Sequence, residues 1–364
     1  MTPPLVCVAM VVRNMERFVG EAIESILNQT FRDFEFVIVD FGSTDRSPSI
    51  ISSYQAGDSR IKLQVIPPCS LAEARNASCA LARGRYIALM DADDMAFPDR
   101  LERQVAYLDQ HPEIALVGGA LECFGASGAP CFIRKNPLAD AEIRAALPRS
   151  TQFFQNTVVM RREVMSAVKG YRKAFAVAED YDLWLRVAER FPVANLAEPL
   201  VRYRIHPEQV GVRTLRLEVM SCLAAQASAQ IRARGGVDPL WQIDEITPEV
   251  LTRLGVNAAA LTQALAEAYG DRINLMLQVC NEEAALALTN ELLELSHSAR
   301  VDGAILSSAC LTAARIHYQR GSFLASLRSV ARAIRARPVV VGRPIKNLLH
   351  HASAVFTALV PRSI

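Results

Sequence analysis

The sequence lacks several features that would assign it to a particular class of protein. Its eight cysteines are scattered, with no CxxC pair and no framework spacing, which favours free, buried thiols over a disulfide scaffold. No apolar run reaches about 18 residues, so no membrane-spanning helix is predicted. No basic stripe interleaved with aromatic residues is present, which argues against nucleic acid as a partner.

The N-terminal residues MTPPLVCVAMVV carry no basic segment and no small-residue cleavage site. They are therefore expected to form a first strand rather than a signal peptide, and with the free thiols this favours a cytoplasmic location. The composition, 51% hydrophobic and 21% charged with a formal net charge of +2, is typical of a soluble globular protein. A length of 364 residues allows one large domain and a smaller one.

The first half of the chain alternates strand-like and helix-like patterns. Short apolar runs, typical of strands buried on both faces, occur at 5–12, 34–40, 61–66 and 85–90. Helical spacing or cap residues mark the segments between them at 17–29, 45–55 and 70–84. The last of these helices is expected to begin with a Ser-x-x-Glu capping box and to end at Gly84. This order predicts an α/β fold with a mostly parallel sheet flanked by helices.

Acidic residues follow two of the expected strands. Asp40 ends the second strand, and Asp91, Asp93 and Asp94 follow the fourth in LMDADD. Open parallel sheets bind ligands beyond the carboxyl ends of their strands, so one crevice could hold all four carboxylates. Carboxylates two positions apart can share Mg²⁺ or Mn²⁺, which also binds substrate phosphates. The alternative is that Asp94 or Asp99 caps the helix that follows.

A second acidic pair, Glu179 and Asp180, opens the amphipathic segment AVAEDYDLWLRVAER. The apolar residues expected to face inward are Leu183, Trp184 and Val187. Acids in a first helical turn are common because they oppose the helix dipole. A carboxylate held there by a rigid helix could also serve as a general base.

Three potential cations alternate in RYRIHPEQVG, residues 202–211. In an extended segment Arg202, Arg204 and His206 lie on one face, an arrangement that suits a neighbouring phosphate. The alternative is a solvated edge strand.

Beyond about residue 210 the strand signal disappears, and no sustained repeat period is apparent. Segments with helical periodicity occur at 213–233, 257–296 and 303–337. The last is expected to form an αα-hairpin that turns at Gly321. The pattern thus predicts a first domain of residues 1–212 and a helical region of residues 213–364.

The C-terminal region is basic, with nine Lys or Arg and one acid, Asp302, from residue 301 to the end. Its last expected helix presents an apolar stripe of Phe323, Leu327, Val330 and Ile334 and a basic stripe of Arg328, Arg332 and Arg335. Three interpretations are open: packing against the first domain, contact with anionic lipid or a lipid-linked acceptor, and contact with a partner.

Six segments, taken in order, resemble the catalytic domain of glycosyltransferase family 2, which has the GT-A fold for nucleotide-diphosphosugars. The resemblance covers residues 4–210. The segments are RNMERFVGEAIESILNQTFRDFEFVIVDFGSTDRS, ARNASCALARGRYIALMDADD, PDRLERQVAYL, VVMRREVMSAVKGYR, AEDYDLWLRV and YRIHPEQV.

The resemblance implies a separate task for each group of residues. Asp180 would be the general base, with Glu179 supporting it or the acceptor. Asp93 and His206 would bind the metal, with Mg²⁺ or Mn²⁺ as cofactor. The residues implied to bind the nucleotide-sugar are Asp40, Arg75, Asp91 and Glu16. Phe41 follows Asp40, where the family often has a second aspartate that contacts the uracil ring.

The expected activity is therefore inverting transfer of a sugar, from a UDP-sugar, to a hydroxyl of a glycan or lipid-linked acceptor in surface polysaccharide assembly. Peripheral contact with anionic lipid at the inner face of the membrane, through the basic C-terminal helices, is one of the three open interpretations of that region. Nucleotidyltransferases usually carry a glycine-rich loop after the first strand, and here no glycine precedes Gly20. A non-catalytic sugar-nucleotide-binding or scaffolding protein is the other alternative, although it would not require Asp91, Asp93 and Asp180 together.

Overall fold

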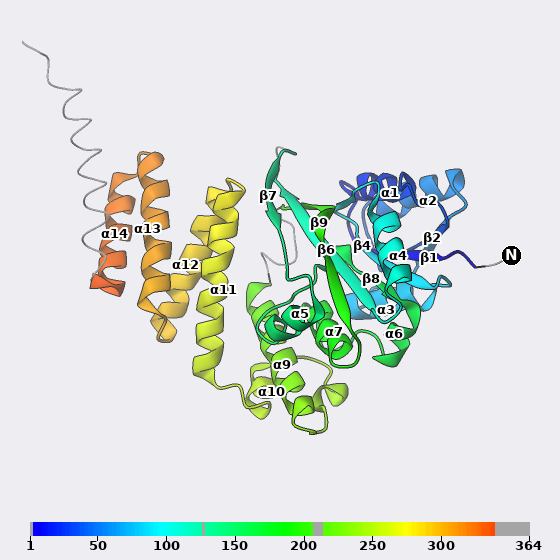
Figure 1. The fold of residues 1–364 in the computed structure, drawn as a ribbon. Helices are drawn as coiled ribbons and strands as arrows, with labels where there is room; N and C mark the ends of the chain where they lie inside the picture. The colour runs from blue at the N-terminus through cyan, green and yellow to red at the C-terminus, as the bar shows by residue number, and fades with distance from the viewer. Residues whose placement is uncertain (1–2, 126–127, 207–213, 339–364) are drawn as a thin grey trace, which may run out of the picture. The chain divides into compact units, whose positions relative to one another are not determined.

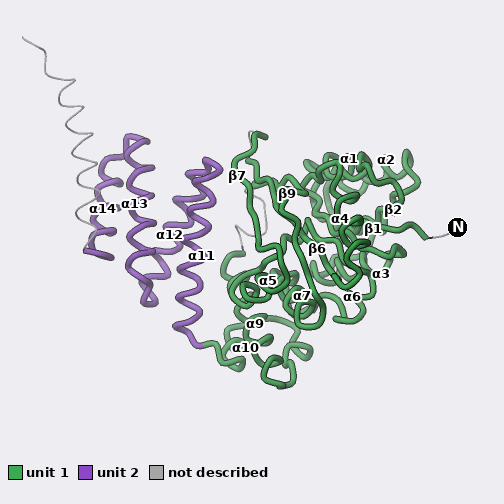
Figure 2. The backbone as a smooth tube through the Cα atoms, in the orientation of Figure 1, with its two compact units in different colours: residues 1–256 green, residues 257–364 purple. Residues whose placement is uncertain are grey.

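The computed structural model describes residues 3–125, 128–206 and 214–338. The chain divides into two compact units, residues 1–256 and residues 257–364 (Figure 2). The first unit combines a sheet with flanking helices, and the described part of the second is helical. These features confirm the expected α/β class followed by a helical region.

A nine-stranded sheet forms the centre of the first unit, in the order β3-β2-β1-β4-β8-β6-β9-β5, with β7 paired to β6 (Figure 1). The strands are β1 (Val6–Val12), β2 (Phe34–Asp40), β3 (Ile61–Val65), β4 (Tyr86–Asp91), β5 (Met95–Ala96), β6 (Leu116–Phe124), β7 (Pro130–Arg134), β8 (Val159–Arg161) and β9 (Val193–Arg204). The four strands expected from the sequence, β1 to β4, are parallel to one another. From β8 onward parallel and antiparallel pairs mix.

Helices cover both faces of this sheet. The described helices of the first unit are α1 (Val19–Leu27), α2 (Ser47–Gly57), α3 (Leu71–Ala80), α4 (Arg100–Gln110), α5 (Asp140–Ala146), α6 (Arg162–Ala167), α7 (Glu179–Ala188), α9 (Leu215–Ala233), which packs against α7, and α10 (Pro248–Arg253), which packs against α9, with short 3-10 turns at Gln155–Thr157 and Pro239–Gln242. On one face of β1, Met10 and Val12 belong to the same hydrophobic cluster as Ile23 of α1 and Leu101 of α4. Because strand residues alternate between faces, α3 and α6 pack on the other side.

Helix α3 ends earlier than expected. It begins at the capping box, where Ser70 Oγ accepts a hydrogen bond from Glu73 N (3.3 Å) and the Glu73 carboxylate accepts one from Ser70 N (3.0 Å). It ends at Ala80, so the prediction that Gly84 terminates the helix is wrong. A Cβ at residue 84 would lie 2.6 Å from Cys7 N, so the glycine allows the chain to pass close to β1.

A buried ion-pair network fastens α9 to the sheet-containing part of the chain. Arg172 pairs with Asp182 on α7 and, at 2.7 Å, with Asp238, which in turn pairs with Arg232 on α9 at 2.6 Å. The side chains of Arg172 and Asp182 are 1% and 0% exposed, so each depends on the other for compensation of its lost hydration. These ion pairs agree with a first compact unit that includes α9 and ends at Val256. The domain boundary predicted at residue 212 stays a prediction.

The second unit consists of two helical hairpins in its described part. Its helices are α11 (Ala258–Gln278), α12 (Glu282–Ser298), α13 (Gly303–Gln319) and α14 (Phe323–Ala336). The turn between α13 and α14 lies at Gly321, with φ of 73°, as expected. The predictions for 207–211, and the part of the predicted helical region beyond residue 338, fall outside the described residues.

All eight cysteines are free, as expected. Cys7, Cys79, Cys123 and Cys310 are buried, but Cys131 and Cys280 are exposed, so the expectation that the thiols are buried is wrong for these two. Over the three described ranges, the structure contains no helix with both the length and the apolar character needed to cross a bilayer.

Candidate active site

The two acidic strand ends lie on the same edge of the sheet. Strand β1 lies between β2 and β4, with Val12 opposite Asp40 and Val11 opposite Asp91. Because all three strands run in the same direction, Asp40 and Asp91 both end at the carboxyl edge, one on each side of β1.

Arg75 on α3 joins this edge to the second acidic pair. Its Nη2 lies 3.2 Å from Asp91 Oδ1, and its Nε lies 2.9 Å from Glu179 Oε1 at the start of α7. The side chain of Arg75 is only 12% exposed, and its guanidinium lies 6.0 Å from the centre of the Tyr171 ring. One buried cation therefore holds two carboxylates that are 88 positions apart in the sequence.

The aspartate turn after β4 also meets the end of β9. Strand β5 pairs with β9, with Met95 opposite Arg202, and this brings His206 Nε2 to 3.1 Å from Asp93 Oδ2. The ring of Phe18 lies 4.7 Å from the His206 ring. The two residues implied as metal ligands are thus adjacent.

A divalent metal fits this pair of residues. Across the described ranges no group of three or more candidate ligand side chains is clustered. Mg²⁺ and Mn²⁺ in nucleotide sites usually take one or two protein ligands and complete their shell with phosphate oxygens and water. Asp93 and His206 would supply the protein ligands, and the remaining positions would belong to the donor diphosphate and water.

Asp94 has a structural partner far away in the sequence. It is 1% exposed, and its carboxylate accepts hydrogen bonds from Arg204 N (2.8 Å) and from Asn156 Nδ2. Burial and the charges of two neighbouring aspartates raise its pKa well above the ordinary value. The prediction that Asp94 or Asp99 caps the next helix is wrong. The carboxylate of Asp94 has the partners just named, and the carboxylate of Asp99, at the N-cap position of α4, makes no cap hydrogen bond and pairs with Arg103 instead.

Asp40 has one oxygen satisfied and one open. Its Oδ1 accepts hydrogen bonds from Gly42 N (3.2 Å) and Ser43 N (3.0 Å), and this fixes the turn after β2. Its buried Oδ2 has no hydrogen-bond partner among the described residues. A buried polar atom without a partner is costly, so this oxygen is suited to accept a hydrogen bond from a ligand.

Glu16 joins two loops at the same edge. Its Oε2 accepts hydrogen bonds from Arg46 N (3.0 Å) and Arg46 Nε (3.2 Å), which links the loop after β1 to the loop after β2. Nucleotide binding by Glu16 stays a prediction. In the second loop Phe41 is 7% exposed, with the Arg13 guanidinium 5.8 Å from its ring centre.

The acids at the start of α7 have raised pKa values. Burial raises the pKa of Glu179 to about 7, against the opposing effect of Arg75 and with a contribution from Asp180. Burial also raises the pKa of Asp180, again opposed by Arg75. The charges of Asp93 and Asp180 add to burial in raising the pKa of Asp91, so the acidic groups of β4 and α7 act on one another. A raised pKa makes a carboxylate a better base near neutral pH.

Two residues that support the site were missed from the sequence. Asn156, the partner of Asp94, lies in a short 3-10 turn and belongs to no motif. Arg100 is fully buried on α4 and donates to Leu89 O (2.8 Å); burial lowers its pKa to about 9, and the charges of nearby aspartates oppose this. A signal was available for Arg100, since it lies four residues before Gln104 on the apolar face of α4.

Arg202, expected beside a phosphate, pairs with Glu122 at 2.8 Å.

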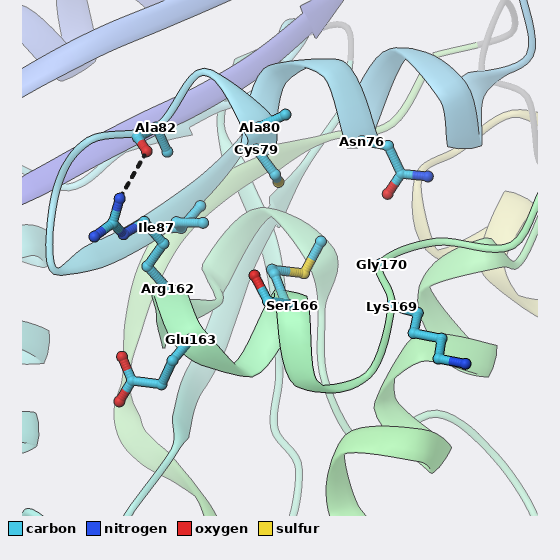
Figure 3. Close-up of a pocket in the computed structure, with 11 residues that line it drawn as sticks. Asn76, Cys79, Ala80, Ala82, Ile87, Arg162, Glu163, Ser166, Lys169 and Gly170 are labelled. Atoms are coloured by element: carbon cyan, nitrogen blue, oxygen red, sulfur yellow. Dashed lines mark hydrogen bonds between the residues drawn. The ribbon is translucent and has the colours of Figure 1, made fainter.

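A cavity of about 570 Å³ lies between α3 and α6 (Figure 3). It is lined by Asn76 and Cys79 from α3 and by Arg162 and Lys169 from α6 and the turn after it. None of the predicted site residues lines this cavity. It is therefore separate from the group of acids at the carboxyl edge.

Comparison with known proteins identifies a family for this chain. Residues 7–167 match the glycosyl transferase family 2 model. An uncharacterized glycosyltransferase of Haemophilus influenzae is 34% identical over 219 residues, which are 57% of this chain and 68% of the relative. The O-antigen biosynthesis glycosyltransferase WbnJ of Escherichia coli is 32% identical over 206 residues, which are 56% of this chain and 80% of the relative. The amylovoran biosynthesis glycosyltransferase AmsE of Erwinia amylovora is 29% identical over 197 residues, which are 53% of this chain and 73% of the relative.

The chain therefore belongs to glycosyltransferase family 2, and it has relatives in polysaccharide biosynthesis. The α/β sheet flanked by helices is the fold expected of that family.

The raised pKa of Glu179 predicts a pH effect on stability. A carboxyl group with a pKa raised from 4.5 to about 7 stabilises the fold only while it is protonated, and this contribution is lost as pH rises through about 7. The side chain of the Glu179→Gln variant stays neutral at every pH. As pH rises from 5 to 8, the unfolding free energy of wild type should therefore fall by roughly 1–3 kcal/mol more than that of the variant. Urea denaturation at each pH measures this difference. Glu163→Gln, at an exposed position on α6, is the control, and an equal pH slope in Glu179→Gln and wild type contradicts the prediction.

Proposed function

We propose that this chain transfers a sugar, with inversion, from a UDP-sugar to a hydroxyl of a glycan or lipid-linked acceptor in surface polysaccharide assembly. The bridge from Asp91 through Arg75 to Glu179 is the observation that carries the proposal, because it ties the carboxylate that ends β4, our proposed donor-side acid, to the acidic pair of α7. The names of the Escherichia coli and Erwinia amylovora relatives support a role in polysaccharide assembly.

In the proposed reaction Asp180 accepts the proton of the acceptor hydroxyl while that oxygen attacks the anomeric carbon. The bond from that carbon to the nucleoside diphosphate breaks on the opposite face of the sugar, so the configuration inverts. The raised pKa of Asp180 suits it to this role near neutral pH. Glu179, held by Arg75, supports Asp180 or orients the acceptor.

The donor is proposed to lie along the carboxyl edge. The open Oδ2 of Asp40 would accept a hydrogen bond from the nucleoside, and Asp91 would contact the ribose side. Arg75 and Glu16 complete the proposed nucleotide-sugar contacts. A metal bound by Asp93 and His206 would neutralise the charge that develops on the leaving diphosphate.

A thermal-shift panel of UDP, GDP, CDP and ADP, each with and without Mn²⁺, tests the donor. UDP with Mn²⁺ should raise the melting temperature, since a ligand at 100 times its Kd stabilises the native state by about 2.7 kcal/mol. Asp93→Asn should lose the part of the shift that requires Mn²⁺. A shift that is equal with and without the metal, or larger for another base, contradicts the proposed donor and metal site.

Asp180→Asn separates binding from catalysis. The variant should keep the donor-dependent thermal shift and lose at least about 10²-fold in transfer rate, because a positioned general base contributes typically 10²–10⁴-fold. Asp99→Asn is the control, since Asp99 pairs with Arg103 on the surface. If Asp180→Asn transfers sugar at the wild-type rate, the base assignment is wrong.

We also propose peripheral contact with anionic lipid at the inner face of the membrane. Residues 303–338 contain six arginines and no acid, and α14 carries three of the arginines in one row: Arg328, Arg332 and Arg335. At low salt the protein should sediment together with vesicles that contain anionic lipid. The variant in which these three arginines are replaced by glutamine should stay in the supernatant. Equal recovery with neutral and anionic vesicles contradicts the contact.

A further inference from the structure

Trp184 on α7 carries a buried donor that its packing does not explain. Its side chain is 0% exposed, and its ring meets the ring of Phe153 edge-on, with 5.9 Å between the ring centres. Its indole N–H has no hydrogen-bond partner among the described residues. Buried tryptophan N–H groups usually donate to an acceptor, because a buried donor without one is costly. A leucine or phenylalanine would fill the same space without this cost.

The geometry of α7 directs this donor toward Asp180. Helical side chains lean toward the N-terminus of their helix, so Trp184 lies over the turn that contains Asp180 and Tyr181. The hydroxyl of Tyr181 is already engaged, because it donates to Leu147 O (2.7 Å) and accepts from Gln226 Nε2 (3.2 Å). Burial raises the pKa of the Asp180 carboxyl group, and Trp184 is one of the groups that oppose this rise. Asp180 is therefore the acceptor in that turn.

Asp180 needs such a donor because the cation that opposes its burial is shared. The Nη2 and Nε atoms of Arg75 pair with Asp91 and Glu179, at 3.2 Å and 2.9 Å. One oxygen of Asp180, Oδ1, accepts a hydrogen bond from Tyr181 N (2.7 Å). A second donor would fix the orientation of this carboxylate, which a single backbone N–H does not do.

Titratable groups act on Asp180 from each element around it. They are Arg75 on α3, Asp91 on β4, Glu179 on α7 and Cys222 on α9. Burial raises the pKa of Asp91, Glu179 and Cys222, and the charge of Asp180 adds to this rise in all three. Arg75 is the one cation among these four groups. Trp184 differs from them because its N–H does not titrate, so it can stabilise the carboxylate at every pH.

We propose that Trp184 is a positioning residue for the general base, with its indole N–H donating to the Asp180 carboxylate that takes the proton of the acceptor hydroxyl. This inference rests on the proposed function of Asp180. In the structure the two groups do not meet the geometry of a full hydrogen bond. Catalytic hydrogen bonds are often long or poorly aligned before substrate binds, and they tighten in the reactive complex.

The indole signal of Trp184 reports this contact by NMR without any change to its own side chain. The chain has two tryptophans, so the full-length protein labelled with ¹⁵N gives two indole signals, and Trp241→Phe identifies the signal of Trp184. This signal should move downfield as Asp180 loses its proton. Asp180→Asn should abolish the movement, whereas Glu179→Gln should keep it. A signal that does not titrate, or that titrates equally in Asp180→Asn, overturns the proposal.

Trp184→Phe keeps a ring against Phe153 and removes the N–H. Because this N–H stabilises the charged form of Asp180, its removal should raise the pKa of that group. The midpoint of the acid limb in the pH profile of kcat/KM should move up by about 1 pH unit, which is a tenfold loss of transfer rate below the midpoint. Trp241→Phe, the matched control, makes the same change at a ring that is 45% exposed and should leave the midpoint unchanged.

Failure of this proposal differs from failure of the proposed function. If Asp180→Asn transfers sugar at the wild-type rate, the base assignment fails and the role of Trp184 fails with it. If Asp180→Asn is inactive and Trp184→Phe keeps the wild-type midpoint, the base assignment stands and the positioning role of Trp184 is wrong. A lower melting temperature with an unchanged midpoint would have the same meaning, because it shows that Trp184 serves packing alone.

Discussion

The ion pairs of Arg75 hold the candidate site together. One carboxylate ends a strand, the other begins a helix, and both lose water as the chain folds. Without a cation between them, their repulsion and lost hydration would drive them to protonate or move apart. The planar guanidinium has donors on several nitrogens, so it can hold Asp91 and Glu179 at once, which a lysine ammonium would do with less fixed geometry. The acid that ends β4 and the acid that begins α7 are therefore parts of one electrostatic unit.

The sequence predicted those parts of the fold that local patterns encode. Buried parallel strands read as apolar runs, and the capping box of α3 marked its start, so β1 to β4 and the helices between them were found. Strand β5 has only two residues and no pattern of its own, yet its pairing with β9 places Asp93 beside His206. Resemblance to a family could suggest that pair of residues, but periodicity could not.

Tertiary contacts override local rules at Asp94. A carboxylate near the start of a helix normally serves as a cap, because helix ends leave N–H groups without partners. Asp94, however, precedes Arg100, the first residue of α4, by six positions, and β5 lies between them. Here Asn156 and the backbone of Arg204 take both oxygens, and neither partner is near in the sequence.

The network around Arg172 sets a physical limit on how this enzyme can be divided. The match to the family model stops at residue 167, before Arg172, Asp182 and Asp238. A fragment cut after β9 would keep Arg172 and Asp182 but would lose Asp238 and the α9 arginine that neutralises it. Grafting the catalytic part onto another chain therefore requires that α9 and Asp238 travel with it, so the smallest transferable module extends to about Val256.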